Sequence, residues 1–157
     1  MSKFTVNIVN RTAISTAGVK VRTNMKNAST DCPKLWQEQF GPRMCSFPAN
    51  PDFPDESYGV SVMIDCDNFD YWALMPIAKD AAVPEGMDSF TIPGGLYAEC
   101  PVASLAELGE AFTYVYGEWI ALQDKYTLNM QGASLELYRS DFIKTGRLVV
   151  YCPLLEK

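Results

Sequence analysis

The chain has 157 residues, a net charge of −6 and no histidine. This length suffices for one domain with a single core, and a hydrophobic share of 48% beside 20% charged residues excludes a globally disordered chain. The absence of histidine excludes Ser-His-Asp and Cys-His catalysis, histidine-ligated zinc or haem, and histidine pH switching. The acidic balance, without a Lys/Arg cluster, argues against direct nucleic-acid binding.

The termini and the cysteines give no sign of export or of a metal centre. No apolar run has signal-peptide length and no stretch approaches the length of a membrane helix, so we expect a cytoplasmic protein without a membrane segment. The five cysteines are scattered and form no Cys-x-x-Cys pair. This pattern favours reduced thiols that pack as small hydrophobic side chains. We therefore predict no metal and no cofactor.

In the first half of the chain, strand patterns flank one predicted helix. The helix begins near Pro33, after a polar cap, and continues to about Phe40, where Gly41-Pro42 ends it. Prolines and acidic residues over 46–57 predict a loop. The segment 65–70 predicts a hairpin turn, because the glycine and final glutamate of a calcium loop are missing. Strands are predicted over 4–9, 16–25, 58–64 and 71–77.

The second half repeats this order. The segment 90–100 predicts one long bent strand, interrupted by Pro93-Gly94-Gly95. Ser104 and Glu107 have the spacing of a capping box, and apolar residues then recur at helical steps as far as Trp119. The last two strands are predicted over 134–138 and over 147–152, the second ending at Pro153.

The order strand, helix, strand, strand thus occurs twice, and each predicted helix contains a tryptophan, Trp36 or Trp119. An internal duplication explains this most simply, with units of about 1–80 and 85–157. Two βαββ units with segregated helices predict an α+β architecture.

Glu136 is the acidic residue that stands out. In the alternating strand 134–138, Leu135 and Leu137 face one side, and Glu136 faces the other with Ser134 and Tyr138. A carboxylate is unusual in mid-strand. One interpretation is a solvated sheet face, which the pattern alone favours. The other is a carboxylate that lines a concave aromatic pocket and acts as counter-ion to a cationic, apolar ligand.

Aromatic side chains would form the wall of such a pocket. Core packing is the alternative role for the two helix tryptophans, whereas tyrosines are common at pockets because one end of the ring is polar. Tyr71 is also considered for the wall. The predicted ligand-binding set is Glu136, Trp36, Tyr58, Trp72, Tyr97, Tyr116, Trp119 and Tyr138.

Five short motifs occur in an order that resembles the GyrI-like small-molecule-binding domains, which are also the effector-binding domains of AraC-type regulators such as Rob and of BmrR. They are the IPGG-x-YA segment at 92–98, YG-apolar at 58–60, Tyr-x-x-Trp at 116–119, Leu-Glu-Leu-Tyr at 135–138, which resembles the family's FE-x-Y strand, and Y-x-P-apolar at 151–154. The sequence departs from the family after Ala98, where the usual His-x-Gly-Pro-Tyr reads Cys100 to Ser104.

The resemblance implies two βαββ (SHS2-type) modules related by a pseudo-twofold axis, an antiparallel sheet with two helices, and a central ligand cleft. It implies a single GyrI-like effector-binding domain over residues 1–157, with no helix-turn-helix domain. It also implies a cationic, amphipathic or aromatic small molecule as the ligand. The buried glutamate of the family's FE-x-Y strand corresponds to Glu136 alone.

Two other functions remain open at this stage. Some GyrI-like proteins are thought to hydrolyse reactive electrophiles, and here Glu136 would act as general base with a tyrosine such as Tyr97 as acid. An acidic module that inhibits a protein partner is the second alternative. For partners, a homodimer and a separate regulator protein are both compatible with the sequence.

Overall fold

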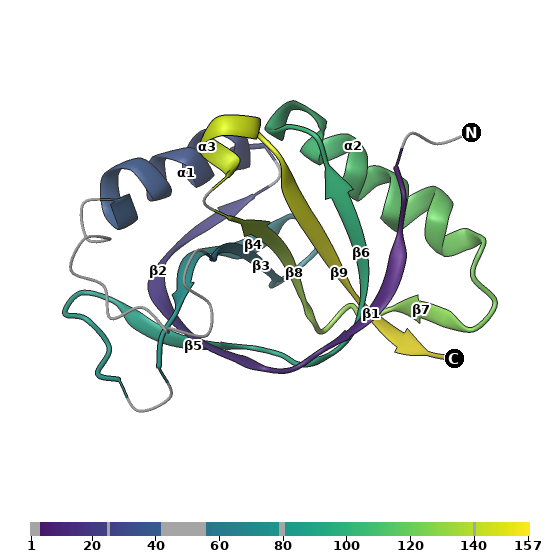
Figure 1. Cartoon of the computed structure of the whole chain (residues 1–157), viewed down its shortest axis with the longest axis horizontal. Helices are drawn as coiled ribbons and strands as arrows, with labels where there is room; N and C mark the ends of the chain where they lie inside the picture. Colours follow the sequence, from purple (N-terminus) through teal and green to yellow (C-terminus); the bar gives the residue numbers. More distant parts are fainter. Residues whose placement is uncertain (1–3, 25, 42–55, 79–80, 140) are drawn as a thin grey trace.

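The computed structural model describes residues 4–24, 26–41, 56–78, 81–139 and 141–157. Figure 1 shows an antiparallel sheet that curls strongly, with the helices α1 and α2 on its outer side. The α+β architecture predicted from the sequence is confirmed. The predicted loop 46–57 lies almost entirely outside the described residues.

The strands and helices follow one another in two similar sets. The strands are β1 Asn7–Arg11, β2 Ile14–Asn24, β3 Ser57–Met63, β4 Asn68–Pro76, β5 Asp88–Ile92, β6 Gly95–Val102, β7 Tyr126–Leu128, β8 Ala133–Tyr138 and β9 Leu148–Glu156. The helical segments are α1 Ala28–Lys34 with its π-helical continuation η1 Leu35–Phe40, η3 Leu105–Glu107, α2 Leu108–Thr113 with its π-helical continuation η4 Tyr114–Trp119, and α3 Phe142–Thr145. Short π-helical turns are frequent at functional sites.

The strand order β1-β6-β9-β8-β3-β4-β2-β5 is symmetric about its middle. β3 and β8 pair there, flanked by β4 and β9, then by β2 and β6, and finally by β5 and β1. Each set therefore contributes the same strands in mirrored places, as an internal duplication predicts. Because β1 leads into β2 and β5 into β6, the two edges of the sheet approach each other and it curls.

The hydrophobic core has three parts. The first fills the inside of the curl and includes Val60, Leu135 and Leu137. The second lies under α2 and η4, and the third under α1 and η1. The faces of β8 predicted from alternation are confirmed, because Leu135 and Leu137 are buried inside the curl and Glu136 lies on the outer, helix-bearing side with Tyr138.

The single bent strand predicted over 90–100 is wrong, because it is two strands with different partners. β5 pairs with β2, whereas β6 pairs with β1 and β9. The break falls where the backbones approach closely. A Cβ added at Gly94 would lie 2.8 Å from the backbone nitrogen of Ala13.

Three predicted boundaries also need correction. The first helix does not begin near Pro33 but at Ala28, so that Pro33 lies inside it. Pro153 does not end the last strand, because it lies within β9, where its carbonyl accepts a hydrogen bond of 2.9 Å from the Asn129 N–H. The missing proline N–H removes only one ladder bond. Ser104 precedes the second helix as expected but makes no side-chain capping hydrogen bond. The sequence patterns also missed β7 and α3, which span three and four residues.

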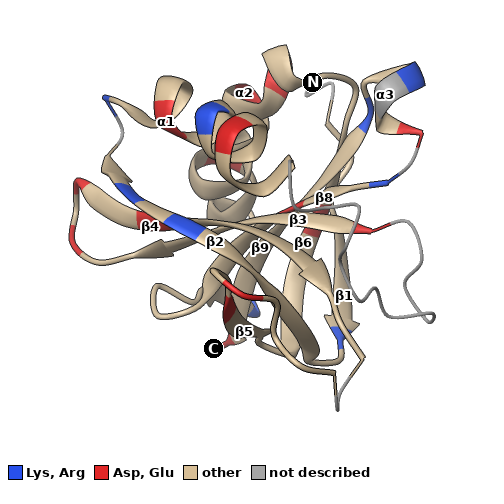
Figure 2. Ribbon diagram, turned by 90° about the vertical axis from the view of Figure 1, so that its left-hand side faces the viewer, with Lys and Arg blue, Asp and Glu red and all other residues tan. Residues whose placement is uncertain are grey.

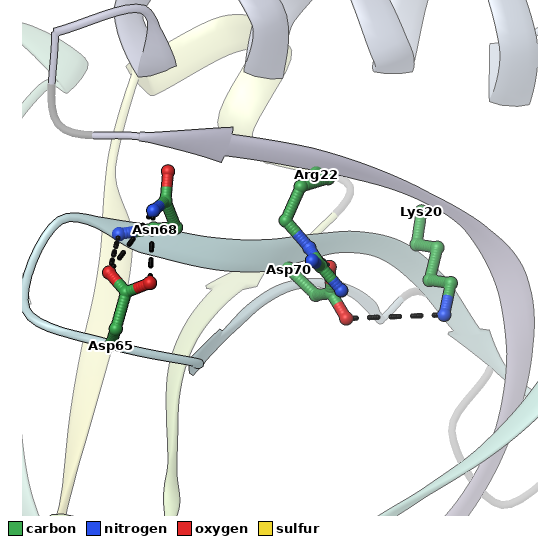
Figure 3. Close-up of polar contacts among 5 residues, drawn as sticks. All are labelled: Lys20, Arg22, Asp65, Asn68 and Asp70. Atoms are coloured by element: carbon green, nitrogen blue, oxygen red, sulfur yellow. Dashed lines mark hydrogen bonds and ion pairs between the residues drawn. The ribbon is translucent and has the colours of Figure 1, made fainter.

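The hairpin predicted between the strands at 58–64 and 71–77 is confirmed as β3–β4 (Figure 3). Asp65 Oδ1 accepts hydrogen bonds from the backbone N–H groups of Asp67 and Asn68, so its carboxylate builds the turn. On the neighbouring strand, Arg22 Nε lies 2.6 Å from Asp70 Oδ1.

Figure 2 shows acidic and basic residues interspersed over the ribbon, and the two basic residues of β2 lie beside an aspartate. Within the described residues, no helix combines the length and the apolar composition needed to cross a membrane.

Candidate functional site

The two central strands present a short polar surface on the outer face of the sheet. We call Gly59, Ser61, Ser134 and Glu136 the central patch. In the β3–β8 ladder, Gly59 pairs with Glu136 and Ser61 pairs with Ser134, and residues two apart on a strand share a face. The strands on either side are covered by apolar clusters under the two helices. The central patch is thus a polar region between two apolar ones.

Glu136 is buried, with only 7% of its surface exposed. Its Oε1 accepts hydrogen bonds from the hydroxyl groups of Tyr138 at 2.5 Å and Tyr71 at 3.2 Å. The Tyr71 hydroxyl in turn accepts one from Trp36 Nε1 at 2.9 Å. Among the described residues, no Lys or Arg forms an ion pair with Glu136.

This environment changes the acidity of the carboxyl. Burial raises the pKa of Glu136 from 4.5 to about 7, although the hydrogen bonds from Tyr138 and Tyr71 act in the opposite direction. Burial also raises the pKa of both tyrosines, so their hydroxyls remain protonated donors. Burial and the nearby Glu136 raise the pKa of Cys32 to about 12, so this side chain is a thiol.

Gly59 makes the contact between Tyr71 and Glu136 sterically feasible. Tyr71 lies on β4 opposite Ser61, and its ring extends diagonally over Gly59 toward Glu136. A Cβ at position 59 would lie 2.2 Å from the Tyr71 hydroxyl oxygen and 3.0 Å from Glu136 Oε1. Any side chain here would therefore push the tyrosine away from the carboxylate.

Aromatic rings surround the carboxylate. The Trp36 ring meets Tyr138 edge to face at a centroid distance of 5.8 Å, and Tyr138 meets Phe142 at 4.9 Å. Trp36, Tyr138 and Phe142 are each half-buried. These rings come from η1, β8 and α3, so three separate segments meet at Tyr138, which hydrogen-bonds to Glu136.

The Ser134 side of the central patch has its own aromatic neighbours. The Tyr116 hydroxyl hydrogen-bonds to Ser134 Oγ, and the Tyr116 ring stacks on Phe112 with centroids 6.0 Å apart. Burial raises the pKa of Tyr116, so its hydroxyl is neutral. The two helices thus supply one aromatic group each, Trp36 near Glu136 and Tyr116 near Ser134.

The structure distributes the eight predicted ligand-binding residues over both faces of the sheet. Tyr138 contacts both Glu136 and Trp36, and Tyr116 reaches the same face through Ser134. Trp119 packs in the core under α2. The other three lie inside the curl, on the opposite face: Tyr58, Trp72 and Tyr97.

This placement corrects the acid–base pair considered for a hydrolase. The Tyr97 hydroxyl donates to the carbonyl of Pro93 at 2.6 Å, inside the curl, so it does not share a face with Glu136. The described residues also contain no group of three or more cysteine and acidic side chains that could hold a metal ion.

Sequence reasoning did not select Gly59, Ser61 and Phe142 as part of this region. Gly59 is part of the YG-apolar motif, but the structural role of this glycine depends on the register between β3 and β8, which pairs it with Glu136. Two cavities, of about 500 and 360 Å³, are lined by other residues, near Arg139 and Arg147 and near Pro93 to Tyr97 respectively. The predicted central cleft therefore stays a prediction.

The comparisons with known proteins agree on the fold. The model of the integron-associated effector-binding protein family (Cass2) matches residues 7–154. SAV2435 bound to tetraphenylphosphonium is similar in structure, with a TM-score of 0.76 and 12% identity over 96% of this chain and 94% of that chain. Integron cassette protein VCH_CASS2, from the mobile metagenome of Vibrio cholerae, has a TM-score of 0.67 and 14% identity over 98% and 100%. The EcmrR C-terminal domain has a TM-score of 0.70 and 11% identity over 99% and 100%. No curated protein matches the chain.

A curled antiparallel sheet with two outer helices, arranged as two similar units, defines the class as a GyrI-like effector-binding domain. More specifically, the chain belongs to the integron-associated effector-binding protein family, whose model covers nearly its whole length. The low identities to the solved structures mean that these establish the fold alone.

Proposed function

We propose that this protein binds a cationic, amphipathic or aromatic small molecule over the central patch, with Glu136 as the counter-ion. The observation that supports this most directly is a buried carboxylate that is surrounded by aromatic rings and has no basic partner among the described residues. SAV2435, which shares the fold, is bound to the cation tetraphenylphosphonium.

The electrostatics favour a cation over a neutral ligand. An isolated buried carboxylate is costly when ionised, and the raised pKa of about 7 expresses that cost. A ligand cation beside Glu136 would favour the ionised form and would itself be stabilised by a charge in a low-dielectric surrounding. The rings of Trp36 and Tyr138 would add cation–π attraction of roughly 0.5–2 kcal/mol each.

Access to the carboxylate requires side-chain movement. Tyr138 hydrogen-bonds to Glu136 and Trp36 packs against Tyr138, and both rings are half-buried and therefore reach the surface. Their displacement by a ligand would exchange protein–protein ring contacts for protein–ligand ring contacts. The flat faces that become available suit an aromatic or amphipathic cation.

The experiment compares two probes, tetraphenylphosphonium and the neutral triphenylphosphine oxide, by calorimetric titration at pH 8. We expect Glu136→Gln to weaken tetraphenylphosphonium binding by at least roughly thirtyfold, since losing one partner of a desolvated charge pair costs about 2 kcal/mol or more. Binding of the neutral probe should not change.

Glu99→Gln is the matched control. Glu99 also lies in a strand and accepts a hydrogen bond from a tyrosine, Tyr151, but Tyr151 lies inside the curl. This variant should bind tetraphenylphosphonium as the parent does. An equal loss of both probes in Glu136→Gln, or an equal loss in the two variants, would contradict the counter-ion role.

A further inference from the structure

The central patch contains two residue pairs, the acidic pair Gly59–Glu136 and the neutral pair Ser61–Ser134. The symmetry of the sheet makes their positions equivalent. Val60 and Leu135 face each other in the middle of the sheet, and Trp72 and Tyr151 pair with them on either side. Gly59 and Ser134 come one residue before this middle pair on their strands, so they correspond to each other. Ser61 and Glu136 come one residue after it and correspond in the same way. The pair Gly59–Glu136 thus has Ser61–Ser134 as its counterpart.

The neutral pair is more accessible than the acidic one. Ser61 and Ser134 are half-buried, whereas Glu136 and Gly59 are buried. Since both serines lie on the two central strands of the sheet, their exposure means that the helical segments leave this part of the patch partly uncovered. A ligand over the serines would therefore reach Glu136 with one end once Trp36 and Tyr138 are displaced.

Hydrogen-bonding capacity is present on this side without any charge. The Tyr116 hydroxyl shares one hydrogen bond with Ser134 and also lies against the Cys152 thiol, and Ser134 retains further donor or acceptor capacity. Within the described part of the chain, the Ser61 hydroxyl has no hydrogen-bond partner. The stacked rings of Phe112 and Tyr116 supply an apolar border.

We propose that Ser61, Ser134 and Tyr116 form a second subsite, which binds an uncharged polar group carried by the same cationic ligand. This inference rests on the proposed function and refines its ligand class to a monocation with a hydroxyl, carbonyl, amide or ether group. Residues two apart on a strand are separated by about 7 Å, so the polar group lies about that far from the cationic centre.

The test uses two probes that differ in one polar group, tetraphenylphosphonium and its derivative with a hydroxymethyl group at the para position of one ring. We expect the parent protein to bind the hydroxymethyl probe about fivefold more tightly, the contribution of one net hydrogen bond. Ser61→Ala combined with Ser134→Ala should abolish this preference, so that the variant binds the two probes with equal affinity. Tyr116→Phe, which keeps the ring, should reduce the preference.

Ser89→Ala is the matched control, because Ser89 is an exposed serine on β5. It should retain the full preference. A parent protein without a preference, or a double serine variant that retains it, would overturn the second subsite. If Glu136→Gln leaves tetraphenylphosphonium binding unchanged, the proposed function fails instead. Thermal unfolding of each variant shows that the comparison is between folded proteins.

Discussion

The acidic and the neutral sides of the central patch are related by the symmetry of the strand order, each with one residue on β3 and one on β8, but they differ in chemistry. On the acidic side, Gly59 leaves room for Tyr71 to reach Glu136. On the neutral side, Ser134 stands where Gly59 would be, Ser61 where Glu136 would be, and Val150 where Tyr71 would be. One side is closed over a titratable group, and the other is partly open over two hydroxyls.

This difference shows that the duplicated fold supplies two similar positions, whereas individual residues decide what each one binds. A buried carboxylate needs hydrogen-bond donors and a small opposite residue, and both requirements are met on only one side, by the donors Tyr71 and Tyr138 and by Gly59. Fold-level symmetry therefore places the site, and local asymmetry gives it a charge.

Removing the charge should produce the largest change in stability. Because the folded pKa of Glu136 is about 7 and its usual value is 4.5, the native state holds a proton that the unfolded state releases between these pH values. The contribution of Glu136 to the free energy of unfolding is thus present below about pH 4.5 and is lost as the pH rises through 7. Glu136→Gln, which does not titrate, should be about 3 kcal/mol more stable relative to the parent at pH 8 than at pH 4.

Denaturant unfolding of parent and variant at each pH gives this difference, and the subtraction removes the contribution of the other acidic residues. A pH-independent difference for Glu136→Gln would mean that the carboxyl titrates normally.

A side chain at position 59, as the neutral side has at position 134, should change the free energy of unfolding by less than the Glu136 substitution does. Gly59→Ala places a Cβ against the Tyr71 hydroxyl and Glu136, so we expect a loss of about 2 kcal/mol in the free energy of unfolding. Gly117→Ala is the control, because nothing lies within 4 Å of a Cβ there and alanine favours helix.

The cost of Gly59→Ala should fall in a Tyr71→Phe background, because the closest clashing atom is then absent. A double-mutant cycle by denaturant unfolding measures this coupling. Equal costs in both backgrounds would show that Tyr71 does not meet Glu136 over Gly59.

The sequence was enough to predict Glu136 and the face on which it lies, but not which residues surround it. Alternation over 134–138 placed Glu136 and Tyr138 on one face and the leucines on the other, since the period of a strand is local. The position of Tyr71 over Gly59 depends on the pairing of three strands that are far apart in the chain. Residue type alone could not say that Tyr58, Trp72 and Tyr97 face the inside of the curl, because aromatic side chains suit either face.

The same limit applies to the fold. The repeated order of strands and helices indicated two units, because each pattern is local. The division of 90–100 into two strands follows from a close approach between Gly94 and Ala13, which no local pattern reveals.

The most direct test of the counter-ion role is the number of protons released when tetraphenylphosphonium binds. Titration calorimetry in two buffers of different ionisation enthalpy measures it at pH 6 and pH 8.5. With a Glu136 pKa of about 7 in the free protein, we predict the release of about 0.9 proton at pH 6 and almost none at pH 8.5. Glu136→Gln should release none at either pH. Tight binding at pH 6 without proton release would contradict the assignment of Glu136 as the group that meets the cation.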